Sequence, residues 1–170
     1  MTDRDIAWLL TRETPRLRRF AVALTGSVEH GDDLVQDTLE RALRKHGQVR
    51  RQASVRSWLF TILHRTHVNQ AKRRRTEHDA LAALQRGDAR PANQDSHVEV
   101  LNIAAALRML APEQREAVLL VGLEGFGYDE AARITGVPMG TLKSRLYRGR
   151  EALWAIRHGD RAARNQRGTG

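Results

Sequence analysis

Histidines and carboxylates are the side chains in this sequence that could do catalytic or metal chemistry. His64 and His67 lie three residues apart on an expected helix, whereas the zinc-binding HExxH motif places its histidines four apart. Asp32, Asp33 and Asp37 could hold Mg²⁺ for a nuclease, but acids at the start of an amphipathic helix also complement the helix dipole. The histidines have no obvious third ligand and the aspartates have this plain role, so we expect no metal site.

Other catalytic arrangements are missing from the sequence. It contains no cysteine, which excludes thiol catalysis, disulfides and Cys-ligated zinc. It has no Gly-rich phosphate loop, no dinucleotide-binding fingerprint and no Ser, His and Asp in an order that suggests a triad. The sequence therefore predicts a protein that is not an enzyme and needs no cofactor.

Basic side chains offer a different chemistry, the binding of a polyanion. The 170 residues include 29 Lys and Arg against 20 Asp and Glu, which gives a net charge of +9. Residues 41–76 contain many basic side chains and no acid, and a smaller acid-free basic cluster occupies 143–150. Two separate basic clusters indicate two places of contact with nucleic acid, the alternative being two solvated helix faces.

Helical periodicity dominates the sequence, and no stretch alternates with the period of a strand. We expect an all-α fold of two small helical domains joined by a flexible linker. The first helix is expected to begin at Thr14-Pro15 and to end at Gly26, the second to cover about 31–47, and the third to start after Ser54. The apolar pattern fails over 76–97, where Gly, Pro and polar residues predict the linker.

These patterns divide the chain into four parts. The domains are expected over 1–75 and 98–157, with the linker at 76–97 between them. The residues from 158 to 170 have nothing to bury, so we expect a disordered tail. No apolar run approaches the ~18–20 residues that span a bilayer, and the N-terminus is acidic where a signal peptide is basic. We therefore expect a cytoplasmic protein without membrane contact.

Residues 128–146 have the pattern of a helix-turn-helix. Gly136 lies where a tight turn uses positive φ, Val137 can pack the turn, and Leu142 and Leu146 are the apolar positions of a second helix. The exposed positions of that helix carry hydroxyl, phenol and basic groups, at Thr141, Lys143, Ser144, Tyr147 and Arg148. Such groups contact guanine edges and phosphates. The alternative is a helical hairpin that only closes a core, but the basic exposed face favours DNA binding.

Three motifs, in order along the chain, carry a resemblance to a known family. They are DDLVQDTLERAL at 32–43, SVRSWLFTILH at 54–64 followed by the basic run, and LAPEQREAV at 110–118 followed by GFGYDEAA and GVPMGTLKSRL. In these motifs the sequence resembles the small bacterial sigma factors of the extracytoplasmic-function (ECF) type. Those proteins keep only the second and fourth conserved sigma domains, which correspond here to 1–75 and 98–157.

The resemblance implies a function in transcription initiation. It implies that the chain binds core RNA polymerase, recognises the −35 and −10 promoter elements, promotes DNA melting and is controlled by an anti-sigma factor. The polymerase contacts would be the clamp helices of the largest subunit and the flap region, and the free protein would be a monomer. The alternative is a stand-alone helix-turn-helix regulator that binds DNA as a dimer, although the sequence shows no dimerisation surface.

The resemblance also implies a role for particular residues. Core docking falls to residues beside the apolar stripe of the first motif, at Asp33, Gln36, Asp37 and Arg41. Recognition of the −10 element falls to the second motif and its basic run, at Arg56, Phe60, His64, Arg65, Asn69, Lys72, Arg73 and Arg74. Recognition of the −35 element falls to Thr141, Lys143, Ser144, Arg145, Tyr147 and Arg148. Relatives usually carry Asn at the position of Arg65. Trp58 begins the apolar arc of its helix, so we expect it in the core.

Overall fold

The computed structural model describes residues 3–45, 47, 55–84 and 100–167, and every secondary-structure element in them is a helix. The all-α prediction is therefore confirmed. The N-terminal domain contains α1 (Asp3–Thr25), α2 (Val28–Lys45) and α3 (Val55–Leu84). The C-terminal domain contains α4 (Val100–Met109), α5 (Pro112–Val118), a π-helical turn (Leu119–Leu123), α6 (Tyr128–Thr135) and α7 (Met139–Arg167). Most of the predicted linker, 85–97, lies outside the described residues.

Helix α1 begins earlier than the sequence pattern predicts, and Pro15 lies inside it rather than at its start. A proline in a helix interior removes one backbone hydrogen bond. The residues before it supply compensation, because Ile6, Leu9 and Leu10 are all buried in the core. Burial of three large apolar side chains contributes about 6 kcal/mol, at about 2 kcal/mol for each, which is about twice the ~3 kcal/mol that a proline in a helix interior costs. The apolar stripe therefore outweighs the local start signal at Thr14-Pro15.

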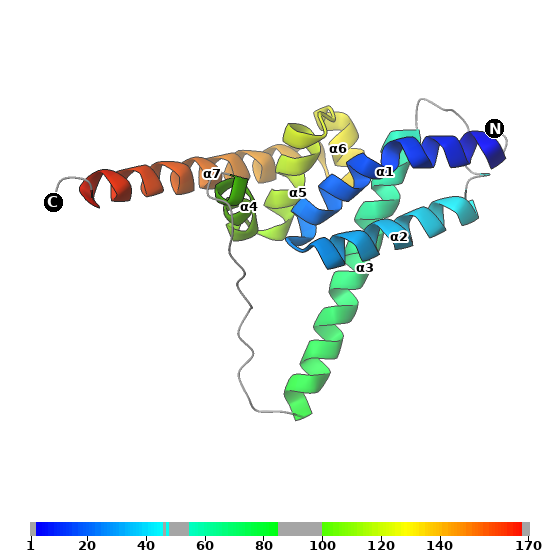
Figure 1. Ribbon diagram of the computed structural model, residues 1–170, viewed down its shortest axis with the longest axis horizontal. Coiled ribbons are helices and arrows are strands. Elements are labelled where there is room, and N and C mark those ends of the chain that lie inside the picture. Colours follow the sequence, from blue (N-terminus) through cyan, green and yellow to red (C-terminus); the bar gives the residue numbers. More distant parts are fainter. Residues whose placement is uncertain (1–2, 46, 48–54, 85–99, 168–170) are drawn as a thin grey trace.

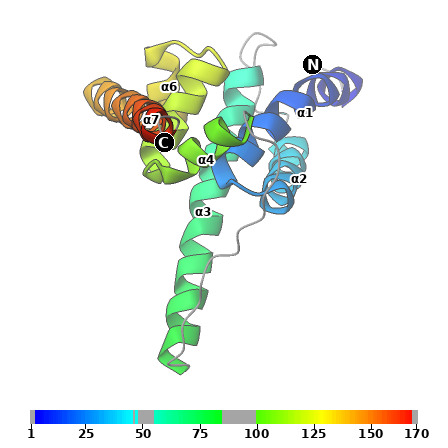
Figure 2. The ribbon, with the colours of Figure 1, turned by 60° about the vertical axis from the view of Figure 1, so that its left-hand side comes forward.

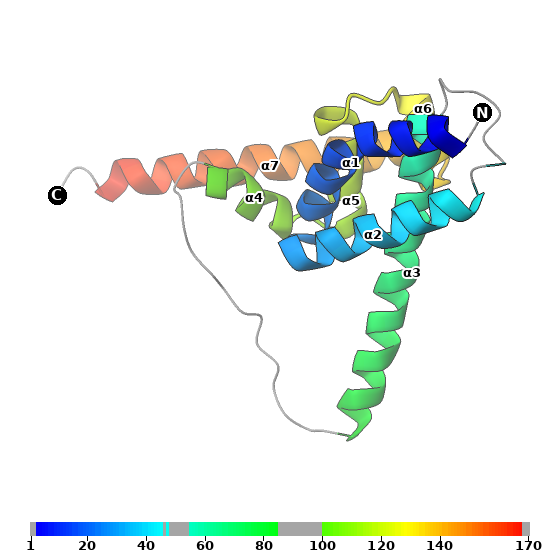
Figure 3. The ribbon, with the colours of Figure 1, turned by 45° about the vertical axis from the view of Figure 1, so that its right-hand side comes forward.

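Helices α1 and α2 pack closely along their lengths (Figure 3). Helix α2 starts at Val28, a few residues before the expected position, and the side chain of Ser27 accepts a hydrogen bond from the backbone N–H of His30. Gly31 is the point of closest approach. A Cβ atom there would lie 2.7 Å from Val22 Cγ2 and 2.8 Å from the Val22 backbone nitrogen, so only glycine fits.

Helix α3 has two halves with different environments. Its N-terminal half lies between the α1–α2 pair and the C-terminal domain (Figure 2), whereas its C-terminal half projects away from the body (Figure 1). Leu59, Phe60 and Leu63 fix the first half, since all three are almost completely buried. The helix continues to Leu84, so residues 76–84 of the predicted linker are helical. The sequence ALAAL at 80–84 has high helix propensity, which explains the extension.

The C-terminal domain has the predicted helix-turn-helix. Helix α6 ends at Gly136, whose φ of 68° is the left-handed conformation that glycine adopts without strain. Helix α7 crosses α5 at Gly149, where a Cβ atom would lie 2.7 Å from Val118 Cγ2. Helix α7 continues to Arg167, in place of the predicted disordered tail (Figure 1). An existing helix extends at little cost, and the added residues include good helix formers such as Ala162 and Ala163.

The two domains pack against each other in this structure. Helix α3 contacts α6, and α1 contacts both α5 and the π-helical turn. Figure 3 shows α6 beside the N-terminal end of α3. Three phenylalanines line this junction: the ring of Phe60 packs edge-on against Phe20 at 5.0 Å and against Phe126 at 4.9 Å between centroids. None of the described helices has the length and apolar character needed to cross a membrane.

Candidate nucleic-acid interface

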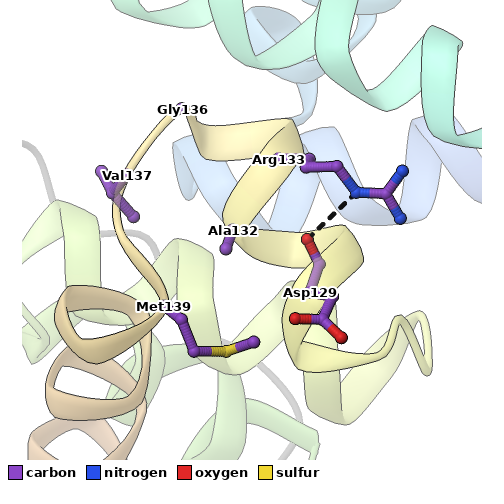
Figure 4. Close-up of a pocket in the computed structure, with 6 residues that line it drawn as sticks. All are labelled: Asp129, Ala132, Arg133, Gly136, Val137 and Met139. Atoms are coloured by element: carbon purple, nitrogen blue, oxygen red, sulfur yellow. Dashed lines mark hydrogen bonds between the residues drawn. The ribbon is translucent and has the colours of Figure 1, made fainter.

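The turn between α6 and α7 holds the second helix of the motif in place. Figure 4 shows the hollow beside this turn, with Val137 in the connecting segment and the Met139 side chain extending from the start of α7 in the direction of Asp129. The Arg133 guanidinium donates a hydrogen bond to the Asp129 carbonyl at 3.3 Å. Ala132 of α6 and Met139 of α7 both line this hollow.

The first half of α7 presents a polar face. Leu142 and Leu146 are buried, and this orientation directs the intervening positions outward. The structure brings all the predicted −35 residues onto this part of α7, with Thr141, Lys143, Tyr147 and Arg148 exposed and Ser144 and Arg145 partly exposed. The phenol ring of Tyr147 is 66% exposed and could stack on a sugar or base. The face therefore combines positive charge, hydroxyl groups and an aromatic ring.

The predicted −10 residues fall into two groups on α3. The first group is exposed on the outer part of the helix and consists of Arg65, Asn69, Lys72, Arg73 and Arg74. The second group, which we call the inner face of α3, consists of Arg56, Phe60 and His64. Phe60 is only 1% exposed, so in this arrangement its ring is not open to the −10 contact that the resemblance implies. Trp58 is partly buried and packs against the core, as expected.

The inner face of α3 is covered by acidic and aromatic side chains of the C-terminal domain. Arg56 donates hydrogen bonds to the carbonyl and the carboxylate of Glu124, the latter at 3.2 Å, and its guanidinium lies 4.3 Å from the centroid of the Phe126 ring. Glu124 also pairs with Arg19 of α1 at 3.0 Å. His64 Nδ1 lies 2.7 Å from the Glu116 carboxylate. These charged contacts and the ring contacts of Phe60 join the two domains.

His67 lies next to this junction, and its imidazole is affected by burial. Burial lowers the pKa of its imidazole from the ordinary value of 6.5, and Arg74, His64 and Arg115 lower it further, while Glu116 opposes them. Its Nδ1 atom is buried without a hydrogen-bond partner. The folded protein therefore holds His67 neutral at a pH where the unfolded chain is already protonated.

We expect His67→Gln to reduce the acid sensitivity of the fold. Below pH 6.5 the unfolded chain binds a proton at His67 that the folded protein binds only at lower pH, so this residue lowers stability as the pH falls. Urea unfolding of both proteins between pH 7.5 and 5.5 measures the effect, since the other histidines contribute to both. The wild type should lose more stability than the variant across this range, and parallel curves would contradict the assignment.

Only two of the four predicted docking residues on α2 are fully exposed to solvent. Asp33 and Gln36 are exposed, whereas Asp37 and Arg41 are partly buried. Asp37 accepts a hydrogen bond of 2.8 Å from Gln70 of α3, so it already has a partner within the chain. Among the residues that the structure describes, no three His, Asp or Glu side chains are grouped as a metal site would require.

Several residues of the junction are absent from the sequence predictions. They are Arg19, Glu116, Glu124, Phe126 and also Arg115, whose guanidinium donates a hydrogen bond of 2.8 Å to the Leu24 carbonyl of α1. Arg19 and Glu124 are 105 residues apart, Arg56 and Glu124 are 68 apart, and His64 and Glu116 are 52 apart. Helical periodicity relates residues within one helix only, so no pattern in the sequence indicates these contacts.

Two protein families match this chain, one in each domain. Residues 10–64 match the family described as "Sigma2 domain of PhyR", and residues 101–153 match "Sigma-70, region 4". The chain is 41% identical over 149 residues to the ECF RNA polymerase sigma factor EcfG of Rhodopseudomonas palustris, covering 87% of this chain and 82% of that protein. It is 36% identical over 144 residues to the ECF sigma factor SigC of Mycobacterium tuberculosis, covering 79% and 74%.

A solved structure has a similar arrangement of helices. The sigma factor RpoE of Bartonella quintana, crystallised with the anti-sigma factor NepR, superposes with a TM-score of 0.76 at 35% sequence identity. The match covers 90% of this chain and 96% of that one.

Proposed function

The chain belongs to the ECF sigma factors of RNA polymerase, and from that premise we propose which of its surfaces meets each partner. Sigma factors are initiation factors rather than enzymes: they bind core polymerase and direct it to promoters. We assign the −35 element to the exposed face of α7, the −10 element to α3 and the clamp helices of the polymerase to α2. We place the protein in the cytoplasm as a monomer when free, and the flap region of the polymerase against its C-terminal domain.

The exposed face of α7 is the observation that carries the −35 assignment. A recognition helix must bury one side against its own domain and offer polar groups to base edges on the other. Lys143 and Arg148 supply donors for guanine or phosphate, and Thr141 and Ser144 supply hydroxyls. All of these side chains are at least partly open to solvent. A DNA duplex could therefore approach without any rearrangement of the helix.

The outer part of α3 supports the −10 assignment. Arg65, Lys72, Arg73 and Arg74 are exposed on a helix that projects away from the body (Figure 1), with Asn69 between them. Closely spaced positive charges on one projecting helix suit the phosphates of a melted strand. The exposed side chains of Asp33 and Gln36 on α2 lie outside this basic region and suit a protein partner instead.

We also assign an anti-sigma partner to this chain. The relative from Bartonella quintana was crystallised with its anti-sigma factor NepR, and that relative aligns with nearly the whole of this chain. A sigma factor held by a second protein needs surfaces on both domains that can be covered together. The packing of the two domains in one body supports this assignment, because a single partner could reach both of them.

Two sets of variants separate the roles. We expect Lys143→Ala combined with Arg148→Ala to lower transcription from a −35-dependent promoter at least about tenfold, because each contact contributes ~1–3 kcal/mol, while core binding is unchanged. Asp33→Arg should weaken core binding about tenfold or more, because a reversed charge in a complementary interface is repelled. Arg133→Ala, an exposed change on α6, serves as the control.

The measurements are run-off transcription from genomic DNA with core polymerase and a direct binding assay with the core. Discrete start sites with shared upstream elements support the proposal, and their absence would overturn it. Loss of core binding in the α7 variant would show that the two roles are not separate.

A further inference from the structure

We propose that α7 carries a second DNA contact, directly after its −35 recognition face, in which Arg150, Trp154 and Arg157 bind the sugar–phosphate backbone that borders the −35 element. The inference rests on the −35 assignment proposed above and deepens it, because the added contact is independent of the base sequence. Trp154 and Arg157 lie beyond residue 153, where the match to region 4 ends. The contact fixes the position of α7 on the duplex and does not select the promoter.

The spacing of these residues is the first observation that supports the contact. Lys143, Tyr147, Arg150, Trp154 and Arg157 follow one another at intervals of four, three, four and three residues, and all five are exposed. Residues at this spacing lie on one face of an α-helix. The proposed −35 residues Lys143 and Tyr147 therefore share one continuous face with the other three. We call these five residues the α7 stripe.

The α7 stripe alternates positive charges with aromatic rings. Lysine and arginine bind phosphates, an aromatic ring can pack against a sugar, and the indole N–H of Trp154 is a donor for a phosphate oxygen. Glu151 is the only acid between residues 139 and 158, and it borders the stripe on the side away from Arg150 and Arg157. Three positive charges in one row favour a polyanion as the ligand of the stripe.

Trp154 is held in place by its own helix. Its ring stacks on the imidazole of His158, with 4.1 Å between ring centroids and an interplanar angle of 22°. The Nδ1–H of His158 donates a hydrogen bond of 2.8 Å to the Trp154 carbonyl, which orients the imidazole. Trp154 nevertheless remains 62% exposed. A large ring that is both ordered and exposed suits contact with a ligand, because little side-chain entropy is lost on binding.

The length of α7 determines which part of the DNA the stripe can reach. A helix rises 1.5 Å per residue, so Trp154 and Arg157 lie about 10 Å and about 15 Å beyond Tyr147 along the helix axis. The major groove is about 12 Å wide. When Lys143 and Tyr147 lie in the groove, the later residues of the stripe reach the backbone at its border and not the base edges. Figure 1 shows the second half of α7 projecting beyond α4, where a duplex can approach it.

The test uses the full chain with Arg150→Ala and Arg157→Ala combined, and separately with Trp154→Ala. Arg44→Ala with Lys45→Ala is the matched control, because it removes the same charge from two exposed positions of the N-terminal domain. The probes are two fluorescent duplexes from a promoter mapped by run-off transcription. The short duplex ends at the −35 element, and the long duplex continues for one helical turn, about ten base pairs, on each side. Each is measured with the natural and with a scrambled −35 element, over a series of salt concentrations.

We expect the double arginine variant to reduce the salt dependence of binding to the long duplex. The slope of log K against log salt should fall by about 2, because each phosphate contact contributes about 1, while the slope for the short duplex changes much less. Trp154→Ala should weaken binding of the long duplex about fivefold or more, through the lost donor and ring contact. The ratio of natural to scrambled affinity should stay at the wild-type value, which also shows that the C-terminal domain is folded. Binding to core polymerase should be unchanged, and the control variant should behave as wild type.

Two results would overturn the inference and leave the −35 assignment intact. The first is an unchanged salt slope in the double arginine variant while the wild type prefers the natural −35 element, which would mean that the stripe does not meet phosphates. The second is normal DNA binding with weakened binding of core polymerase, which would mean that the stripe faces a protein. A wild type that binds natural and scrambled duplexes equally well would instead remove the −35 assignment of α7, and the inference with it. That failure is therefore distinguishable from the other two.

Discussion

Gly31→Ala is expected to destabilise the N-terminal domain by about 2 kcal/mol, even though alanine is the better helix former. The new Cβ atom would lie 2.8 Å from both the Cα and the nitrogen of Val22. Backbone atoms cannot rotate away as the end of a side chain can, so α1 and α2 must move apart. Their shared core would loosen along its whole length. Urea unfolding followed by circular dichroism measures the loss.

Gly140→Ala is the matched control for this change. Gly140 also lies in a helix, near the start of α7, but a Cβ atom there meets nothing within 4 Å. We expect its stability to change by less than about 1 kcal/mol, in the stabilising direction, because alanine has the higher helix propensity. If the two variants were equally stable, close packing at Gly31 would not be the reason for the glycine.

Arg115→Ala is expected to cost about 3 kcal/mol, because a charged donor is removed from several backbone acceptors at once. The Arg115 guanidinium donates to the carbonyls of Leu107, Arg108 and Leu110 at the end of α4 and of Leu24 at the end of α1, over distances of 2.7–3.2 Å. The last carbonyls of a helix have no partner within it and carry partial negative charge. Arg115 satisfies two helix ends from different domains, and thermal or urea unfolding reports its loss.

The geometry of the guanidinium is as important here as its charge. Burial lowers the pKa of Arg115, and the charge of Arg108 adds to the effect, yet an arginine remains protonated. We expect Arg115→Lys to recover only part of the stability, because an ammonium group cannot reach several carbonyls in a fixed plane. The control is Arg133→Ala, which removes a single contact to a carbonyl at 3.3 Å. Equal losses in Arg115→Ala and Arg133→Ala would contradict this account.

The sequence predicts those parts of the fold that depend on neighbours within one or two turns. Gly136, Leu142 and Leu146 identify the helix-turn-helix because turn conformation and helical periodicity are local properties. The same reasoning fails at Pro15, where a local start signal competes with burial of residues on both sides. It also fails after residue 158, where low apolar content does not prevent a helix from continuing.

The candidate site was predictable only in part, for a related reason. The exposed faces of α2 and α7 can be predicted, because the apolar stripe of each helix identifies the side that is buried. The burial of the inner face of α3 cannot be predicted in this way, because it depends on contacts with Glu116, Glu124 and Phe126 of the other domain. A basic arc on one helix is compatible equally with contact to DNA and with contact to buried carboxylates. Only the packing of the two domains distinguishes these alternatives.

If Arg56, Phe60 and His64 read the −10 element as proposed, their contacts with the C-terminal domain constrain how this protein can diverge. A substitution at these positions that adjusts promoter preference also changes the fit to the C-terminal domain. The compensating change must then arise far away in the sequence, at Glu116, Glu124 or Phe126. A chimera that joins the N-terminal domain of one relative to the C-terminal domain of another would inherit a mismatched junction, although each half is intact. Under that proposal, promoter choice and the packing of the two domains evolve together.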